Sequence, residues 1–275
     1  MRSKCRQTPR PGRTSIGMSA NTTEGWANMT AVLEGKVAFV TGGSRGIGEA
    51  VALRLAEDGA DVALTCQHGV ERAASVVDRI KALGRRAWAV SADCADPAAV
   101  RDAVDRAAAE FGRLDILVNN AGVGVLGPVE DLSPADVDRV LNVNVRAPFI
   151  ASQAALRHMT EGGRIINIGS CMAERVAFPG GSLYATSKTA LTGLTKALAR
   201  ELGPRGITAN LIHPGPIETD MNPSDGPGAE TQQGFTALGR YGQPSDVAAT
   251  VAHLAGAGGR YITGAAIAVD GGFAA

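Results

Sequence analysis

Tyr184 and Lys188 are the residues whose types and spacing most directly suggest chemistry. They stand four positions apart in the pentapeptide Tyr184-Ala185-Thr186-Ser187-Lys188, so a helix over this segment would place the phenol and the ammonium on one face. An ammonium that close favours the phenolate, so we expect the pKa of Tyr184 to lie below its ordinary value of about 10. Such a phenol can exchange a proton with an alcohol near neutral pH. The spacing alone is weak evidence, because many solvated helix surfaces share it.

Seven short apolar runs alternate with longer helical patterns and must position this pair. The runs predict strands near 36–41, 61–65, 86–91, 115–119, 163–169, 207–212 and 265–269, and the patterns predict helices near 47–58, 70–83, 97–111, 134–160, 184–202 and 244–256. The runs lack polar alternation, which is typical of strands buried on both faces of a parallel sheet. The chain therefore predicts an α/β fold, with a single Rossmann-type, doubly wound, seven-stranded parallel sheet and helices on both faces.

The composition fits one folded domain preceded by a segment of different character. The 275 residues are 45% hydrophobic and 20% charged, which allows a full α/β core, and no run predicts a membrane span. We expect the domain to occupy 33–275. Residues 1–32 lack apolar periodicity, so we expect either a disordered extension or a mis-assigned start, with Met18 or Met29 as the true one.

Charge and cysteine content argue against several classes of protein. The formal net charge is +0, with +4 in residues 1–30 and −4 in the remainder, which does not favour a nucleic-acid partner. The four cysteines show neither metal-ligand spacing nor a pairing pattern, which favours a reducing, cytoplasmic environment and no metal site. They are Cys5, Cys66, Cys94 and Cys171.

A glycine-rich turn follows the first expected strand and opens the first expected helix. It reads Thr41-Gly42-Gly43-Ser44-Arg45-Gly46-Ile47-Gly48, a Gly-x-x-x-Gly-x-Gly spacing. Glycines in such a turn allow a pyrophosphate to approach the backbone closely, and the helix N-terminus favours its negative charge. Its position after the first strand predicts a dinucleotide site at the carboxyl edge of the sheet.

The end of the second expected strand bears on which dinucleotide is bound. Folds of this type that prefer NAD place an acid there to bind the ribose 2′-hydroxyl. This chain instead has Thr65-Cys66-Gln67-His68, with no carboxylate to repel a 2′-phosphate. Arg45 can pair with that phosphate and His68 can add a hydrogen bond. The sequence therefore favours NADP(H), while NAD(H) stays open.

Further motifs fall at the same edge, and jointly they resemble the short-chain dehydrogenase/reductase family. They are Asn119-Asn120-Ala121-Gly122, Ser170, Tyr184 with Lys188, and Pro214-Gly215. The resemblance covers essentially all of 33–275 and is nearest to 3-oxoacyl-acyl-carrier-protein reductases. The interval from Ser170 to Tyr184 looks one residue longer than in the commonest members.

The resemblance implies four catalytic residues. Tyr184 would be the acid in reduction and the base in oxidation, and Lys188 would lower its pKa and bind the nicotinamide ribose. Ser170 would orient the substrate carbonyl and stabilise its oxyanion. Asn144 would hold a water chain from the lysine to solvent. The resemblance also implies cofactor contacts: Asp93 with the adenine, Asn119 and Gly122 on the ribose side, and Ile217 and Thr219 with the nicotinamide carboxamide.

The full expected cofactor site comprises Gly42, Ser44, Arg45, Gly46, Ile47, Gly48, His68, Asp93, Asn119, Ala121, Gly122, Tyr184, Lys188, Pro214, Gly215, Ile217 and Thr219.

Substrate and partners are less tightly constrained by the residues. A mainly apolar carbonyl or alcohol is expected, with a lid at 221–235 and pocket candidates Val123, Val125, Leu126, Met172, Val176 and Phe178. An acyl-carrier protein would need a basic patch, for which the candidates are Arg146, Arg157 and Arg175. The resemblance implies a homotetramer or homodimer. The alternative function is a nucleotide-binding or redox-sensing protein that uses the same pocket without turnover.

Overall fold

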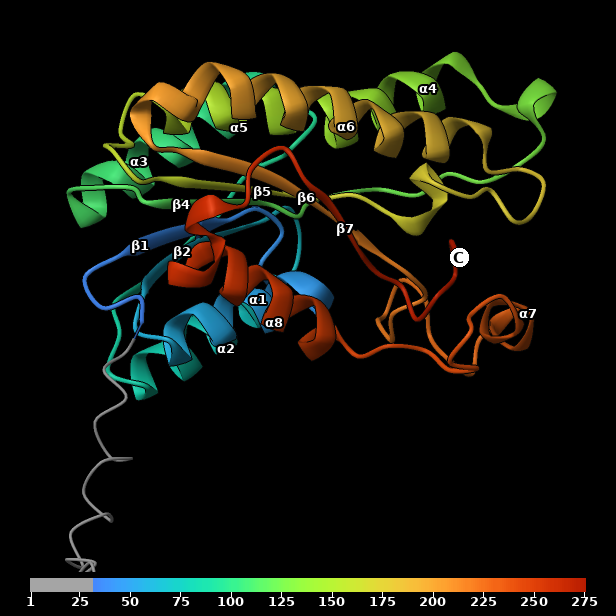
Figure 1. The fold of residues 1–275 in the computed structure, drawn as a ribbon, viewed down its shortest axis with the longest axis horizontal. Coiled ribbons are helices and arrows are strands. Elements are labelled where there is room, and N and C mark those ends of the chain that lie inside the picture. Colours follow the sequence, from blue (N-terminus) through green and yellow to red (C-terminus); the bar gives the residue numbers. More distant parts are fainter. Residues whose placement is uncertain (1–31) are drawn as a thin grey trace, which may run out of the picture. The chain divides into compact units, whose positions relative to one another are not determined.

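A seven-stranded parallel sheet runs through the centre of the protein, whose computed structural model describes residues 32–275 (Figure 1). The strands are β1 (Val37–Val40), β2 (Asp61–Cys66), β3 (Ala87–Ser91), β4 (Ile116–Asn119), β5 (Arg164–Ile168), β6 (Thr208–Pro214) and β7 (Ala266–Val269). Their order is β3-β2-β1-β4-β5-β6-β7, and every neighbouring pair is parallel. The predicted fold class is confirmed. The predictions for Cys5, the basic N-terminal cluster and the starts at Met18 and Met29 lie outside the described residues.

Helices cover both faces of the sheet (Figure 1). One face carries α1 (Gly46–Glu57), α2 (Val70–Ala82) and α8 (Pro244–Ala255); the other carries α3 (Pro97–Phe111), α5 (Ala147–Ala155) and α6 (Ser182–Leu202). Strand β1 shows why the runs lack polar alternation. Ala38 and Val40 pack into the first layer, and Val37 and Phe39 pack into the second. All four side chains are buried, so both strand faces must be apolar.

The strand order reverses between β1 and β4, and this reversal creates the site. Successive strands are added in one direction from β1 to β3 and in the other from β4 to β7. The loops that leave β1 and β4 therefore separate at the carboxyl edge, where ligands bind in sheets of this kind. The glycine turn follows β1, and the Asn119–Gly122 segment follows β4.

The prediction of a single helix at 134–160 is wrong, because the structure divides this segment into three helical parts. Helix α4 (Pro134–Leu141) passes into a π-helical turn at Asn142–Arg146, and α5 then begins at Ala147. The backbone N–H of Ala147 bonds to the carbonyl of Asn142, five residues back. Pro148 has no N–H, so the carbonyl of Asn144 lacks its ordinary α-helical partner. The turn places Asn144 at a point where helices of functional sites often deviate.

The segment expected to form a lid, 221–235, contains a helix that its composition did not predict. Residues 229–234 form a short helix, α7 (Ala229–Gly234). The amides of Asn222 and Gln232 pair with each other at 3.1 and 3.0 Å, which joins the start of the segment to this helix. Of the helices within residues 32–275, none is both long and apolar enough to cross a bilayer.

Candidate active site

The glycine turn is shaped by contacts that exclude side chains. Gly42 and Gly46 adopt positive φ angles of 65° and 56°, which favour glycine. The N–H of Gly42 donates to Oγ1 of Thr65 at 3.0 Å, which fixes the turn to the end of β2. A methyl group on Gly48 would overlap the carbonyl oxygen of Gly42. The backbone can therefore fold back over the start of α1 only because this position has no side chain.

This turn leaves a helix N-terminus available to an anion. Arg45 is the N-cap of α1, and its side chain makes no capping hydrogen bond within the described part of the chain. The first N–H groups of a helix lack intrahelical acceptors and attract negative charge. Thr219 lies across from them, since a methyl group on Gly46 would come 3.2 Å from its Cγ2. An uncapped N-terminus and a cradle that a Cβ would fill fit the pyrophosphate of a dinucleotide.

The segment after β4 is fastened to the glycine turn by Asn120. The backbone N–H groups of Asn120 and Ala121 each donate to Oγ1 of Thr41 at 3.0 Å. The side-chain amide of Asn120 donates to the carbonyls of Thr41 and Gly42 at 3.0 and 3.1 Å. The two loops that border the site therefore form one rigid unit.

Asn119 has a buried side chain, and its expected place on the ribose side of the cofactor stays a prediction. Its amide nitrogen donates to Oδ1 of Asn167 at 2.8 Å and to Oγ of Ser152 at 3.3 Å, and the side chain is 3% exposed. Asn167 donates in turn to Oγ1 of Thr195 at 2.9 Å. Asn119 therefore belongs to a buried polar network between the sheet and its helices, because successive side chains of a strand alternate between faces.

Tyr184 and Lys188 lie on the face of α6 that packs against the sheet. Nζ of Lys188 donates to the carbonyl of Ile168 at 3.0 Å and lies 5.8 Å from the centroid of the Tyr184 ring. Lys188 is only 4% exposed, so the surface-pair explanation for this spacing does not hold. Gly122 passes close by, since a methyl group on it would come 3.2 Å from Nζ.

The pKa values of Tyr184 and Lys188 contradict the expectation that the lysine would lower the pKa of the tyrosine. Burial raises the pKa of Tyr184, and the neighbouring Ser170 hydroxyl opposes that rise only in part. Burial also lowers the pKa of Lys188 to about 8. The expected depression of the tyrosine pKa is therefore wrong for this structure, because removal from water disfavours the phenolate. The neutral phenol is the form that can donate a proton.

Ser170 stands at the end of β5, next to the phenol. Its Oγ accepts a hydrogen bond from the N–H of Met172 at 3.2 Å, so the hydroxyl caps the short helical turn that follows β5. A serine hydroxyl that accepts one bond keeps its own proton to donate. Ser170 can therefore donate to an oxygen held near Tyr184.

Asn144 holds the loop beside Lys188. Its Oδ1 accepts from the N–H of Val123, and its Nδ2 donates to the carbonyl of Val123, both at 2.9 Å. The amide also donates to Oγ of Ser187 at 3.0 Å. These bonds occupy the side chain and fix the Val123 loop beside the lysine.

The remaining expected cofactor residues border the same edge. His68 and Asp93 are exposed after β2 and β3, and Oδ1 of Asp93 accepts from the N–H of Ala95 at 2.8 Å. Pro214 ends β6, and Gly215 approaches Asp270 so closely that a methyl group would lie 2.6 Å from its Cα. Buried positions within this set include Ser44, Pro214 and Ile217.

Aromatic residues form an apolar wall near Tyr184. The rings of Phe178 and Phe235 lie 6.4 Å apart with an interplanar angle of 13°, and Phe235 meets Phe273 edge-on at 5.8 Å. Met172 and Tyr184 pack into the same cluster. Phe273 was missed by the sequence analysis, since it lies 89 residues beyond Tyr184 and no motif marks it. Among the other candidates, Leu126, Val176 and Met221 are more than half exposed.

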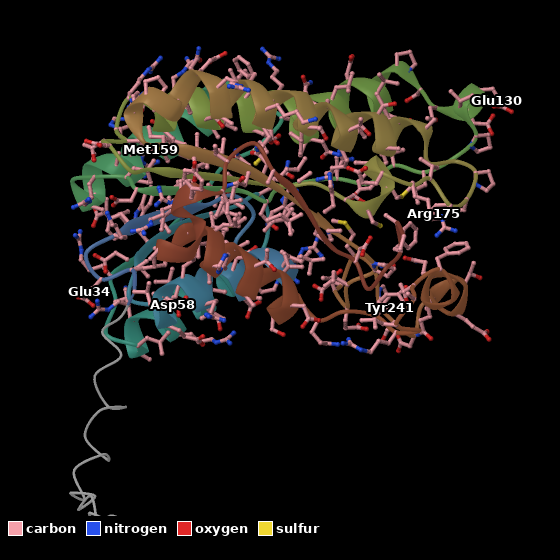
Figure 2. The ribbon with its side chains drawn as sticks, in the orientation of Figure 1. Glu34, Asp58, Glu130, Met159, Arg175 and Tyr241 are labelled. Carbon is pink, nitrogen blue, oxygen red and sulfur yellow. The ribbon has the colours of Figure 1, made fainter. Side chains whose placement is uncertain are left out.

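The three candidate arginines do not form one basic patch. Figure 2 shows Met159 and Arg175 at opposite ends of the molecule, and Arg157 stands two residues before Met159. Helix α5 carries the chain away from the carboxyl edge, which explains this separation. Arg175 is itself engaged, because its guanidinium lies 5.8 Å from the Phe273 ring and donates to the Phe273 carbonyl at 2.7 Å.

His213 is a site residue that the sequence analysis missed. Its Nδ1 accepts the backbone N–H of Ser170 at 3.1 Å, and the side chain is 2% exposed. In the neutral ring the proton is then on Nε2, which lies 3.4 Å from Oε1 of Glu174. His213 thus positions Ser170 through its backbone. Its position directly before the Pro214-Gly215 motif was the only feature of the sequence that could have marked it as a site residue.

Replacing His213 with glutamine is expected to remove an acid-sensitive contribution to stability. Burial lowers the pKa of His213. The unfolded chain therefore takes up a proton as the pH falls below about 6.5, while the folded chain does not, and stability falls there but not at higher pH. Between pH 7 and 5, Tm should decline more steeply in the wild type than in His213→Gln. Exposed His253→Gln is the control and should keep the wild-type slope; equal slopes for His213→Gln would contradict the assignment.

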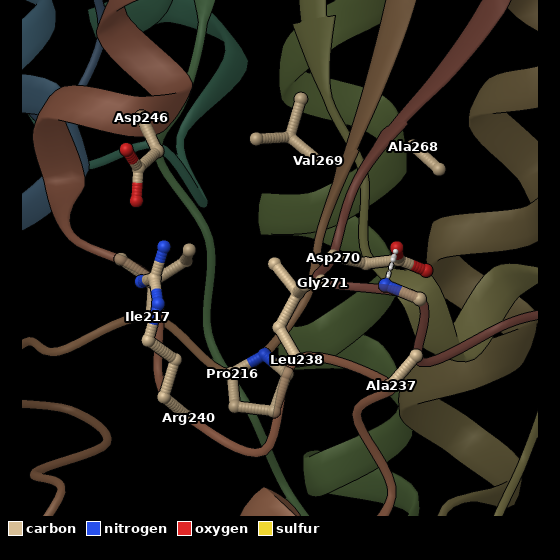
Figure 3. A pocket seen from close by; sticks show the side chains of 12 residues that line it. Pro216, Ile217, Ala237, Leu238, Arg240, Asp246, Ala268, Val269, Asp270 and Gly271 are labelled. Atoms are coloured by element: carbon tan, nitrogen blue, oxygen red, sulfur yellow. Dashed lines mark hydrogen bonds between the residues drawn. The ribbon is translucent and has the colours of Figure 1, made fainter.

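A cavity of about 510 Å³ lies beside β7, away from Tyr184 and Ser170 (Figure 3). Its lining comes from the segment after β6, the loop 237–242, and the end of β7. Asp270 anchors this end by accepting the N–H of Gly272 at 2.9 Å. Ile217 is the one expected cofactor residue on its wall. The cavity borders the C-terminal end of β7 rather than Tyr184, Ser170 or Lys188.

The fold and site define a dinucleotide-binding α/β protein with a Ser-Tyr-Lys cluster at the carboxyl edge, and comparison with known proteins agrees. The family described as Enoyl-(Acyl carrier protein) reductase matches residues 42–274. The cyclic-di-GMP-binding biofilm dispersal mediator protein of Escherichia coli is 45% identical over 88% of this chain and 98% of its own length. Versicolorin reductase of Emericella nidulans is 41% identical over 87% of this chain and 96% of its own length.

A solved structure extends this agreement to the fold. A short chain dehydrogenase from Burkholderia cenocepacia, crystallised in complex with NADP, is 59% identical with a TM-score of 0.88, over 88% of this chain and 99% of that one. The chain therefore belongs to the short-chain dehydrogenase/reductase family, and it is an NAD(P)-dependent oxidoreductase. The resemblance predicted from the motifs is confirmed.

Proposed function

We propose that this protein is an NADP(H)-dependent oxidoreductase that interconverts a ketone and a secondary alcohol. The observation that carries the proposal is the convergence of Tyr184, Ser170 and buried Lys188 at the edge where the glycine turn presents an uncapped helix N-terminus. Bound NADPH would supply a hydride to the carbonyl carbon. The protein residues would bind the cofactor, orient the ketone and protonate its oxygen.

In ketone reduction, Tyr184 would donate the proton to the carbonyl oxygen. Its raised pKa keeps the phenol protonated at neutral pH, and Ser170 would donate a second hydrogen bond to the same oxygen. Lys188, held by the Ile168 carbonyl, would stabilise negative charge on the phenolate that remains. Asn144 would keep the Val123 loop in place beside the lysine.

The proposed cofactor site follows the carboxyl edge from the adenosine to the nicotinamide. Asp93 would contact the adenine, the helix N-terminus would hold the pyrophosphate, and Gly122 would allow the ribose to approach Lys188. The backbone turn comprises Gly42, Ser44, Arg45, Gly46, Ile47 and Gly48, and the nicotinamide side comprises Pro214, Gly215, Ile217 and Thr219. The Burkholderia relative was solved with NADP, which supports this choice over NAD.

Cofactor preference provides a direct test of the Arg45 role. We expect kcat/KM with NADPH to exceed that with NADH by about tenfold or more, because a charge-assisted contact to phosphate contributes roughly 1.5–3 kcal/mol. Arg45→Gln should lower the NADPH value by about tenfold and change the NADH value far less. A wild-type preference for NADH in steady-state assays would refute the assignment.

The aromatic wall favours an apolar ketone as the substrate. Met172, Phe178, Phe235 and Phe273 gather beside Tyr184 and leave little to bind a charged group. Reduction of a 3-oxoacyl group is compatible with these residues. Arg175 already donates to the Phe273 carbonyl, so it offers an acyl-carrier protein less free positive charge than the sequence suggested.

A second candidate function is binding or sensing of a nucleotide without turnover. One observation favours it, because the Escherichia coli relative is a cyclic-di-GMP-binding protein by name. The complete Ser170, Tyr184 and Lys188 cluster supports catalysis instead, since binding alone does not need it. A ketone panel followed by NADPH absorbance separates the two, because absence of turnover on every ketone would favour the sensor.

We further propose that the protein assembles as a homodimer or homotetramer. Strand β7 ends the sheet and exposes Ala266 and Ala268, so its edge is available for pairing in the described structure. Helices α4 and α5 expose Leu141 and Phe149. Sedimentation that shows only a monomer at micromolar concentration would reject the assembly.

A further inference from the structure

Two arginines from different elements hold the same carboxylate oxygen. Nη1 of Arg72 lies 3.0 Å from Oδ2 of Asp220, and Nη1 of Arg45 lies 3.5 Å from that atom. Arg72 and Asp220 are 148 residues apart in the sequence, so neither was a candidate from motifs. The cluster carries two positive charges and one negative charge, which leaves it attractive to a further anion.

The position of the cluster identifies the anion that would reach it. Arg45 belongs to the glycine turn, and Arg72 lies in the first turn of α2, directly after the end of β2. Gly69 adopts a φ of 81°, and a methyl group on it would come 3.1 Å from Nε of Arg72. The Arg72 side chain therefore folds back over the turn that contains His68. That turn is where the 2′-phosphate of NADP(H) is expected in the proposed function.

Asp220 links this cluster to the segment that covers the substrate side. It follows Thr219, which packs beside Gly46, and it precedes the segment that contains α7 and Phe235. Phe235 stacks against Phe178 in the aromatic wall. An ion pair at Asp220 thus connects the adenosine end of the site to its substrate end.

We propose that Arg72 is a second cation for the 2′-phosphate, and that the Asp220 carboxylate competes with this phosphate for Arg45 and Arg72. The inference rests on the proposed NADP(H) function. A phosphate carries up to two charges and three acceptor oxygens, so it satisfies two guanidinium groups better than one carboxylate oxygen does. Binding of the phosphate releases Asp220.

The ion pairs are weak enough to be exchanged. The side chains of Arg45, Arg72 and Asp220 are 46%, 55% and 59% exposed, so solvent screens their attraction. Surface pairs of this kind change an equilibrium by a few-fold at most. The competition therefore tunes affinity and does not block the site.

The test measures binding by calorimetry with two nucleotides that lack nicotinamide. Adenosine 2′,5′-bisphosphate carries the 2′-phosphate, and adenosine 5′-monophosphate does not. Asp220→Asn should tighten the bisphosphate about threefold, because the competing charge is gone. Arg72→Ala should weaken it about tenfold and should abolish most of the gain from Asp220→Asn in the double variant.

Matched controls separate this effect from a general change of charge. Asp225→Asn removes an exposed acid of the same segment, and Arg101→Ala removes an exposed arginine of α3; neither forms an ion pair among residues 32–275. Both should leave bisphosphate binding unchanged. Unchanged or weaker binding in Asp220→Asn, with normal discrimination by the wild type, would overturn the competition alone. Equal wild-type binding of both nucleotides would overturn the competition and the NADP(H) preference together.

Discussion

Tyr184→Phe is expected to lower kcat for ketone reduction by about a thousandfold, the range that a positioned general acid contributes. The substitution keeps the ring in the cluster with Met172 and Phe273 and removes only the hydroxyl. Neither neighbour replaces the phenol, because the Ser170 hydroxyl is a poor acid and Lys188 is held by the carbonyl of Ile168. NADPH consumption with a ketone substrate gives the rate.

Tyr261→Phe is the control for this experiment. It removes the same hydroxyl from a side chain that is 99% exposed, and it should retain wild-type turnover. Thermal unfolding of both variants shows whether each is folded. If Tyr184→Phe kept more than a tenth of the wild-type kcat, the proton would have to come from another group.

Gly48→Ala is expected to disrupt both stability and dinucleotide binding. The added methyl would meet the carbonyl oxygen of Gly42 and would lie 2.5 Å from Nδ2 of Asn120, so the turn would have to open. Opening it breaks the bond from Asn120 to the Gly42 carbonyl and moves the N-terminus of α1. Overpacking of this kind costs about 1–3 kcal/mol, and loss of the helix N-terminus should reduce NADPH affinity by at least about tenfold.

Gly193→Ala adds the same methyl group where the structure has room. Gly193 lies inside α6, and nothing among the described residues outside its own helix backbone lies within 4 Å of the added methyl. This control should be neutral or slightly stabilising, because alanine loses less conformational entropy than glycine. Denaturant unfolding and NADPH titration of both variants give the comparison. A Gly48→Ala protein with wild-type stability and affinity would contradict the proposed turn.

The sequence predicted the features that depend on local pattern. The apolar runs predicted all seven strands because residues buried on both faces, such as Val37 to Val40, leave a continuous signal. Tyr184 and Lys188 were found because one helix carries both. The motifs after β1, β4 and β5 were located because parallel strands end at one edge.

The features that depend on tertiary contacts could not be predicted from the sequence. The pKa of Tyr184 was expected to fall because a lysine was near, but burial has the larger effect in the folded chain. Asn119 and Asn120 are neighbours of one type, and only the strand register decides which one faces the glycine turn. Arg72 meets Asp220 across 148 residues, a contact that no spacing rule contains.

The most direct test of the central claim is the transfer of deuterium from NADPH labelled at the transferable position of the nicotinamide. Wild-type protein should reduce a ketone from the panel to an alcohol that carries one deuterium at the carbinol carbon, detected by mass spectrometry. Tyr184→Phe should form this product about a thousandfold more slowly. Binding of NADPH without a deuterated alcohol from any ketone would contradict the account.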